Sequence, residues 1–195
     1  MAVRREEFGG DESARLCSFS SPIGWLGIAG RDEIVRAVFV GHPSAASVRR
    51  AVASWWAECS ASGSLPEADW FPKLRQQLLA YADGERVEFE EFHLELPERT
   101  PFRDKVLATT RRLGYGATTT YGDLARKVGH PGAARAVGTV MSTNRFPILI
   151  PCHRVLAAGG KLGGYTAPSG TDLKQRLLDM EQAASSARSR SARGS

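Results

Sequence analysis

The chain opens with short runs of apolar and β-branched residues that are separated by turn residues. The runs cover residues 16–19, 25–29 and 34–40, with turns at residues 21–24 and 30–32. Runs of this length between Gly- and Pro-containing turns are typical of β-strands. The pattern therefore predicts three consecutive strands near the N-terminus.

Apolar residues then recur at helical spacing. A helix is predicted over residues 45–59, where one face is apolar, and a second over residues 71–82, with Pro72 in its first turn. The apolar face of the first helix consists of Val48, Val52, Trp55 and Trp56. The Trp pair favours a core stripe, with an aromatic patch for nucleic-acid bases as the alternative.

Alternation of apolar and polar residues returns in residues 87–90 and 92–96 and predicts further strands, followed by a linker over residues 97–101. We therefore expect residues 1–98 to form an α/β scaffold domain. The sequence assigns this domain no chemistry of its own.

The second half has helical periodicity. Residues 102–113 predict an amphipathic helix, and residues 121–128 and 133–143 predict two shorter helices. Thr118, Thr119 or Thr120 can cap the second helix, and Gly129 to Gly132 form a tight turn. Two short helices around a Gly-containing turn are typical of a helix-turn-helix element. We expect residues 99–181 to form a mainly α-helical domain.

The last of these helices carries unusually small side chains, at Ala133, Ala134, Ala136 and Gly138, around the single basic residue Arg135. Glycine inside a helix costs about 1 kcal/mol relative to alanine. Close approach to a DNA backbone would use such a surface, and tight internal helix packing is the alternative.

An apolar run over residues 146–150 leads into Pro151, Cys152 and His153. A thiol becomes a good nucleophile only as a thiolate, and a neighbouring imidazole with a buried acid behind it can take the proton. The alternative is a small core cysteine followed by a surface histidine.

Charge divides the chain. Residues 1–101 hold 11 Lys and Arg against 16 Asp and Glu, whereas residues 102–181 hold 12 against 5. The positive charge therefore lies in the half that carries Cys152, which favours a polyanion such as DNA as the partner. A solvated basic surface is the alternative. Residues 182–195 are rich in Ser, Ala and Arg and predict a disordered basic tail.

Three cysteines without a CxxC pair argue against a disulfide framework or a cysteine-built zinc site, and they fit a reducing cytoplasm. We expect no metal and no cofactor. The sequence has no run of 18 apolar residues and no apolar signal segment at its start, so we expect no membrane partner.

Several separated motifs resemble the O6-alkylguanine-DNA alkyltransferases, also called methylated-DNA–protein-cysteine methyltransferases. The resemblance is dense over residues 102–181. It rests on the segments Thr118 to Ala125, Gly132 to Gly138, Pro147 to Val155, Gly163 to Tyr165 and Lys174 to Glu181, and on Asn144.

The resemblance implies a role for each matched residue. Cys152 would accept the alkyl group, His153 would take the thiol proton through a water molecule, and Glu181 would orient His153. Tyr121 would donate a proton to guanine, and Asn144 would act as a hinge. Arg135 would intercalate in DNA beside Ala133, Ala134 and Gly138, while Val155, Tyr165 and Thr166 would line the substrate pocket. Arg154 is expected to brace the structure.

The resemblance also implies the reaction and the partner. One alkyl group would pass irreversibly from O6-alkylguanine, or O4-alkylthymine, to each protein molecule after the base is flipped from the minor-groove side. The protein would act as a monomer on double-stranded DNA in the cytoplasm, with a winged-helix-like helix-turn-helix. The sequence departs from the family pattern at Arg145 and in the longer loop 163–170. These differences bear on the range of alkyl groups that the protein would accept. The alternative is a non-catalytic alkyltransferase-like protein that only binds the lesion.

Overall fold

The computed structural model describes residues 13–60, 64–96 and 99–191. Its N-terminal sheet begins with three antiparallel strands, β1 (Arg15–Ser21), β2 (Gly24–Arg31) and β3 (Ile34–His42), which confirms the three strands predicted from the sequence. A short strand, β4 (His93–Leu94), joins the far side of β3 in the parallel direction.

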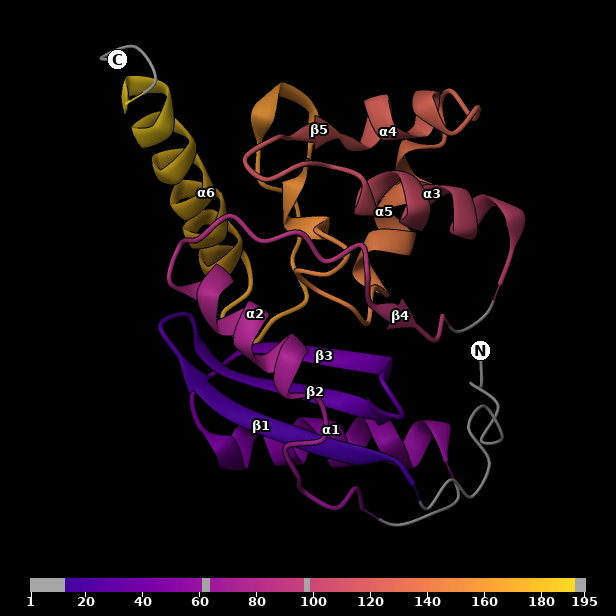
Figure 1. Ribbon diagram of the computed structural model, residues 1–195. Helices are drawn as coiled ribbons and strands as arrows, with labels where there is room; N and C mark the ends of the chain where they lie inside the picture. The colour runs from indigo at the N-terminus through magenta and orange to yellow at the C-terminus, as the bar shows by residue number, and fades with distance from the viewer. Residues whose placement is uncertain (1–12, 61–63, 97–98, 192–195) are drawn as a thin grey trace.

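Helices cover both faces of this sheet (Figure 1). Helix α1 (Ala45–Cys59) packs Val48 and Val52 against Leu16 of β1, and α2 (Pro72–Ala82) lies on the opposite face. Successive strand residues point to opposite faces, so Leu16 contacts α1 while Cys17 joins the other core. Trp56 is buried, which confirms a core position for this residue.

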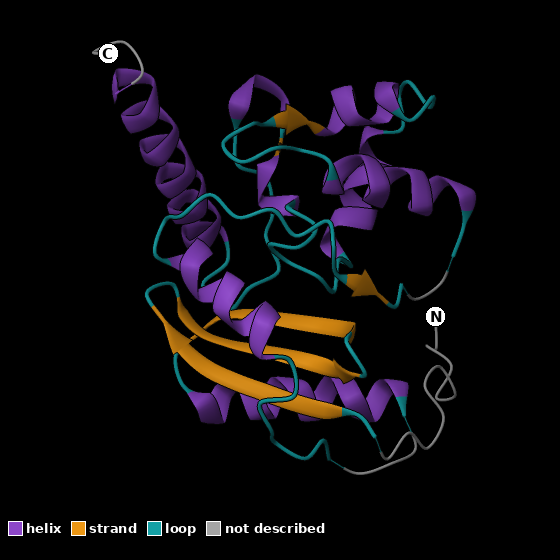
Figure 2. Ribbon diagram, in the orientation of Figure 1, coloured by secondary structure: helices purple, strands orange, loops and turns teal. Residues whose placement is uncertain are grey.

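The C-terminal half is mainly helical, as Figure 2 shows, and the chain is therefore an α/β unit followed by a helical unit. The predicted helices are present, each within about two residues of the expected ends. The elements are α3 (Pro101–Arg111), β5 (Thr119–Thr120), α4 (Tyr121–Lys127), α5 (Ala134–Ser142), a 3₁₀ turn η1 (Cys152–Arg154), β6 (Val155–Leu156), a second turn η2 (Ala158–Gly160) and α6 (Thr171–Ser191).

The two halves share one apolar core. Ile28 of β2 and Leu78 of α2 belong to the same cluster of buried residues as Val106, Ile150 and Leu177 of the C-terminal half. The backbone also crosses between the halves, because the Val38 N–H donates to the Arg145 carbonyl at 2.8 Å. The sheet therefore supports the segment that leads to Cys152.

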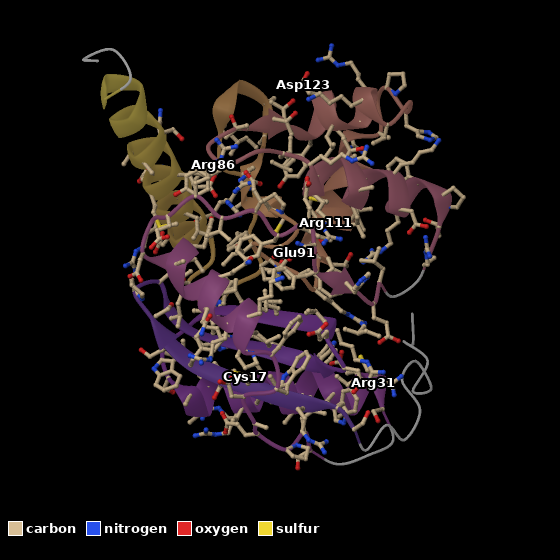
Figure 3. The ribbon with its side chains drawn as sticks, in the orientation of Figure 1. Cys17, Arg31, Arg86, Glu91, Arg111 and Asp123 are labelled. Carbon is tan, nitrogen blue, oxygen red and sulfur yellow. The ribbon has the colours of Figure 1, made fainter. Side chains whose placement is uncertain are left out.

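The strands predicted over residues 87–90 and 92–96 are wrong except for His93–Leu94. The Nη2 atom of Arg111 donates to the carbonyls of Phe89, Glu90 and Phe92 at 2.9, 3.1 and 2.6 Å. Figure 3 labels Arg111, whose side chain extends from α3. The backbone acceptors are satisfied by a side chain instead of a neighbouring strand, so alternation alone gave the wrong element.

The disordered tail predicted for residues 182–195 is also corrected. Helix α6 continues through Ser191, and residues 192–195 lie outside the described residues. Alanine is the best helix former, and three alanines follow Glu181 within six residues. Ala184 packs on the core and the Ser185 hydroxyl donates to the Glu181 carbonyl, so the first turn beyond Glu181 stays attached.

Within the described ranges, no helix combines the length and apolar character that a membrane crossing requires.

The Arg111 contacts predict a stability effect. Replacing Arg111 with Met should lower the free energy of unfolding by about 2 kcal/mol, because three carbonyls lose their donor. Urea unfolding of the wild type and the variant measures this difference. Lys105→Met removes an exposed cation from the same helix and should stay within about 0.5 kcal/mol of the wild type. Equal effects of the two substitutions would contradict this role of Arg111.

Candidate active site

A pocket of about 470 Å³ opens beside Cys152. This volume is in the usual range for sites that enclose a small molecule. The lining residues come from the start of α4, the end of α5, the segment before η1 and the loop before α6: Tyr121, Gly138, Met141, Ser142, Asn144, Pro147, Cys152, Gly164, Tyr165 and Thr166. The structure thus brings six of the residues predicted for the site around one cavity.

The backbone before Cys152 adopts an unusual path. Pro151 has φ −75° and ψ 66°, and the Cys152 N–H donates to the Ile150 carbonyl at 2.7 Å, which is an inverse γ-turn. Ile148 has φ 74°, a conformation that a β-branched residue rarely adopts and that costs about 1–3 kcal/mol. The surrounding contacts must hold this segment in place.

Asn144 provides several of those contacts. Its Nδ2 donates to the Ile150 carbonyl at 2.9 Å, and its Oδ1 accepts from the Phe146 N–H at 3.1 Å. The same side chain hydrogen bonds the Cys152 thiol. Because Asn144 follows α5 directly, this one amide links the end of that helix to the bend that carries the thiol.

Burial raises the pKa of the Cys152 thiol, while the hydrogen bond from Asn144 and the charge of Lys174 act in the opposite direction. The resting thiol is therefore protonated at neutral pH and needs a base during reaction. Cys17 and Cys59 are also buried. Burial and the neighbouring Asp69 raise the pKa of Cys17 to about 12. Of the three cysteines, Cys152 is the one that lines the pocket.

His153 follows Cys152 in η1 and is fully buried. Its Nε2 lies 2.9 Å from Oε1 of Glu181, which is on α6. Burial lowers the pKa of His153, although the Glu181 carboxylate acts to raise it. Among the described residues, Nδ1 has no hydrogen-bond partner. A neutral His153 that donates from Nε2 therefore keeps its Nδ1 lone pair free to accept a proton.

Arg154 pairs with the same carboxylate. Its Nη2 donates to Oε1 of Glu181 at 2.8 Å, its Nε donates to Oε2 at 2.9 Å, and its Nη1 donates to the Leu113 carbonyl. The Gly116 N–H adds a bond to Oε2 at 2.9 Å. Burial alone would raise the pKa of Glu181, but the bonds from His153 and Arg154 hold it well below its usual range. Glu181 is therefore ionised at neutral pH.

Lys174 places a second buried cation near the thiol. Its Nζ donates to the Val155 carbonyl at 2.7 Å and lies over the Tyr121 ring at 5.9 Å. Burial lowers the pKa of Lys174, and a charge on Cys152 would raise it. The carbonyl of Val155, a residue that the resemblance places in the substrate pocket, thus already accepts one hydrogen bond and keeps one further lone pair.

Tyr121 and the loop before α6 form the other walls of the pocket. The pairing of β5 with β6 aligns Thr120 with Leu156, which brings Tyr121 beside the segment after Cys152. Burial and the nearby thiol raise the pKa of Tyr121, so its phenol keeps its proton. A Cβ atom on Gly163 (φ 67°) would lie 3.0 Å from the Tyr121 ring, so glycine is favoured there and a larger residue would be strained.

Tyr165 and Thr166 belong to the same loop. The Tyr165 hydroxyl is buried and has no hydrogen-bond partner among the described residues, and Thr166 donates to the Ser142 carbonyl at 3.0 Å. The loop is thereby attached to the end of α5.

The residues predicted to contact DNA lie on α5. Ala133 is the N-cap, Ala134 is half-buried and Arg135 is exposed, one turn before the pocket residue Gly138. Helix α5 packs against both α3 and α4, in line with the expected pair of short helices. The small residues therefore form a surface that runs from the exposed helix start to the edge of the pocket.

Three parts of the site were not predicted from the sequence: the ammonium of Lys174, the Arg154–Glu181 ion pair and the hydroxyl of Tyr81, which lies 2.6 Å from Oε1 of Glu181. Lys174 and Glu181 lie seven residues apart on the buried face of α6, with Leu177 between them. Charged residues at core positions of an otherwise apolar stripe could have signalled this pair. No group of three or more His, Cys, Asp or Glu side chains in the described chain is arranged to hold a metal ion.

The buried carboxylate predicts a second stability effect. Glu181→Gln should lower the free energy of unfolding by about 3 kcal/mol at neutral pH, because Arg154 loses its counter-charge. A carboxyl with a depressed folded pKa stabilises the fold above its unfolded pKa of about 4.3, and this contribution is lost as the pH falls. The difference between wild type and variant should therefore shrink in acid, as measured by unfolding at a series of pH values.

The exposed Asp179 supplies the control for this comparison. It lies on the same helix and accepts a hydrogen bond from Gln175 at 2.7 Å. Asp179→Asn should change the free energy of unfolding by less than about 0.5 kcal/mol. An equally small loss of unfolding free energy for Glu181→Gln at neutral pH would contradict a stabilising role for the Glu181 charge.

Comparisons with known proteins identify one family. A family model described as the 6-O-methylguanine DNA methyltransferase DNA binding domain matches residues 101–183. The methylated-DNA–protein-cysteine methyltransferase of Methanosarcina acetivorans is 37% identical over 84% of this chain and 95% of its own length. The constitutive enzyme of that name from Bacillus subtilis is 36% identical over 83% and 92% of the two chains.

Solved structures show the same similarity. The crystal structure of the Mycobacterium tuberculosis O6-methylguanine methyltransferase superposes with a TM-score of 0.70 and 33% identity, over 88% of this chain and 94% of that one. A crystal structure of the M. tuberculosis protein in complex with DNA gives a TM-score of 0.71 at 33% identity, over 87% and 94%. The chain belongs to the methylated-DNA–protein-cysteine methyltransferase family.

Proposed function

We propose that the chain repairs DNA by moving one alkyl group from O6 of guanine, or from O4 of thymine, to the sulfur of Cys152. The observation that carries this proposal is the pocket that Cys152 lines together with Tyr121 and Asn144, backed by the buried His153–Glu181 pair. This combination favours group transfer to the thiol over the alternative, a protein that only binds the lesion.

The reaction is a displacement at the alkyl carbon. The Cys152 sulfur forms the new carbon–sulfur bond while the bond from that carbon to O6 breaks, and guanine leaves with the electron pair. The thiol proton passes to Nδ1 of His153 through a water molecule, and Tyr121 supplies a proton to the departing guanine. This leaves an imidazolium at His153 and a phenolate at Tyr121. Proton exchange with solvent then restores both residues, so the net change is the transfer of one proton from the sulfur to guanine.

The product is a thioether, which is stable to hydrolysis. Each molecule therefore accepts one alkyl group and is then spent. Two features support control of reactivity before that event: the raised pKa of the buried thiol and the lowered pKa of His153. Both groups are neutral until an alkyl carbon is in place, and the proton moves as the carbon–sulfur bond forms.

We infer that α4 and α5 act as a winged-helix-like helix-turn-helix, with α5 in the minor groove of double-stranded DNA. The small side chains of Ala133, Ala134 and Gly138 suit a narrow groove. An alkylated base must leave the stack to reach the thiol, at a cost of a few kcal/mol. Arg135 would fill the gap, because its planar, charged group can stack between bases.

We further propose a division of labour between the two halves of the chain, as the sequence predicts. Residues 1–98 form a scaffold, and residues 99–181 carry DNA binding and the alkyl acceptor. The protein works as a monomer in the cytoplasm, beside the nucleoid in a bacterium. Three free cysteines fit that reducing compartment.

The alkyl acceptor predicts a defined product. After mixing with duplex DNA that contains one O6-methylguanine, the intact protein should gain one methyl group on the peptide that holds Cys152, at one per molecule. Mass spectrometry measures this gain. Cys152→Ser should gain none, and Cys17→Ser should behave as the wild type. Repeated turnover, or tight binding without any gain in mass, would contradict the proposal, and the latter would support the lesion-binding alternative.

The intercalation role of Arg135 predicts a substrate-dependent loss. Arg135→Ala should slow methyl transfer from duplex DNA about 30-fold, which corresponds to the cost of unstacking. Transfer from the free base O6-benzylguanine should change by less than about twofold, because no stack has to open. Single-turnover rates on both substrates measure this. Lys127→Ala, which removes an exposed cation from α4, is the control. Equal losses of transfer rate on duplex DNA and on the free base for Arg135→Ala would exclude intercalation.

A further inference from the structure

A side chain from the N-terminal half reaches the catalytic pair. Tyr81 lies on α2 and is fully buried. Its hydroxyl is 2.6 Å from Oε1 of Glu181 and 3.2 Å from Nε2 of His153. The three atoms form a closed triangle in which Tyr81 is separated from Glu181 by 100 residues of sequence. The scaffold half thus contributes a polar group to the centre of the proposed chemistry.

The directions of the hydrogen bonds follow from the charges. Burial and the Glu181 charge raise the pKa of Tyr81 well above its usual value, so the phenol keeps its one proton. That proton is donated to Glu181, because an ionised carboxylate is the stronger acceptor and the contact is the shorter one. Nε2 of His153 also faces Oε1 of Glu181, and it must then donate as well. Tyr81 and His153 therefore share one acceptor oxygen.

Ring packing holds Tyr81 in this position. Its ring makes edge contacts with Phe89 and Tyr115, at centroid distances of 5.9 and 6.0 Å. The Tyr115 hydroxyl points elsewhere, to the Gly84 carbonyl at 3.0 Å. Two tyrosines therefore pack side by side at this point, and one of them reaches the His153–Glu181 pair.

Charged and titratable groups approach His153 from three parts of the fold. They are Tyr81 on α2, Cys152 and Arg154 on η1, and Lys174 and Glu181 on α6, while Tyr165 in the loop before α6 approaches Cys152 and Glu181. Arg154 and Lys174 disfavour an imidazolium, whereas Glu181 favours it. A group that weakens Glu181 as a partner of His153 therefore shifts this balance toward the neutral imidazole.

We propose that Tyr81 is a positioning residue for alkyl transfer: by donating to Oε1 of Glu181, it keeps His153 neutral with Nδ1 free to accept the thiol proton. The inference rests on the proposed function, because it assigns a role in the same proton transfer. It also gives the N-terminal half a chemical contribution beyond supporting the fold.

The test is the pH dependence of methyl transfer by the full-length protein. Single-turnover rates are measured with saturating duplex DNA that holds one O6-methylguanine, for the wild type and for Tyr81→Phe. The rate falls in acid as His153 takes up a proton and can no longer act as the base. Without the tyrosine hydroxyl, Glu181 binds the imidazolium more strongly. The acid limb of the rate–pH profile should therefore shift to higher pH by about one pH unit.

Tyr115→Phe is the matched control, because it removes a hydroxyl from the adjacent ring without touching the pair. Its acid limb should coincide with that of the wild type. Tyr81→Phe should retain the rate of the alkaline plateau within about threefold, and thermal unfolding should show that both variants are folded.

The possible outcomes separate the inference from the function on which it rests. An acid limb of Tyr81→Phe that coincides with the wild type, or an equal loss of rate at every pH, would overturn the positioning role while leaving alkyl transfer intact. Absence of methyl transfer by the wild type itself would instead overturn the proposed function. A shift shared by Tyr115→Phe would mean that packing, and not the Tyr81 hydroxyl, sets the pH dependence.

Discussion

The buried charge of Glu181 is the constraint on which the site depends. An isolated carboxylate could not be buried at an acceptable cost, and donors from three other segments are directed at it. The donors come from α2, from the loop after α3 and from η1, and Glu181 itself lies on α6. Satisfying this one group therefore fixes four segments relative to one another, and one of them, η1, carries both the proposed base and its neighbour, the thiol.

The same arrangement explains how a reactive cysteine can be kept in a buried pocket. Because Arg154 neutralises Glu181, the carboxylate does not force a proton onto His153, and burial favours the neutral forms of both His153 and Cys152. Lys174 stands near the sulfur and favours the negative charge that develops during attack. The proposed site is thus prepared for one proton transfer that is coupled to bond formation. Such a design suits a protein that can use its thiol only once.

Local patterns in the sequence predicted most of the fold. The three long strands, the helix of residues 45–59 and the helices around the helix-turn-helix position follow from periodicity and turn residues alone. The segment 87–96 did not, because Arg111 takes the backbone hydrogen bonds that a strand would have made. The motifs singled out Cys152, Tyr121, Asn144 and Tyr165, which line one pocket in the structure, while the roles assigned to them stay predictions. Tyr81 could not be identified, since its spacing from Leu74 and Leu78 resembles an ordinary core stripe, and only the fold reveals that its hydroxyl meets Glu181.

The central claim is that His153 rests as a neutral imidazole with its proton on Nε2 and a free lone pair on Nδ1. The most direct measurement is ¹⁵N NMR of the His153 ring in the full-length, unalkylated protein at neutral pH. We predict a protonated Nε2 and an unprotonated Nδ1. A resting imidazolium, or a proton on Nδ1, would contradict the proposed path from the thiol to the histidine.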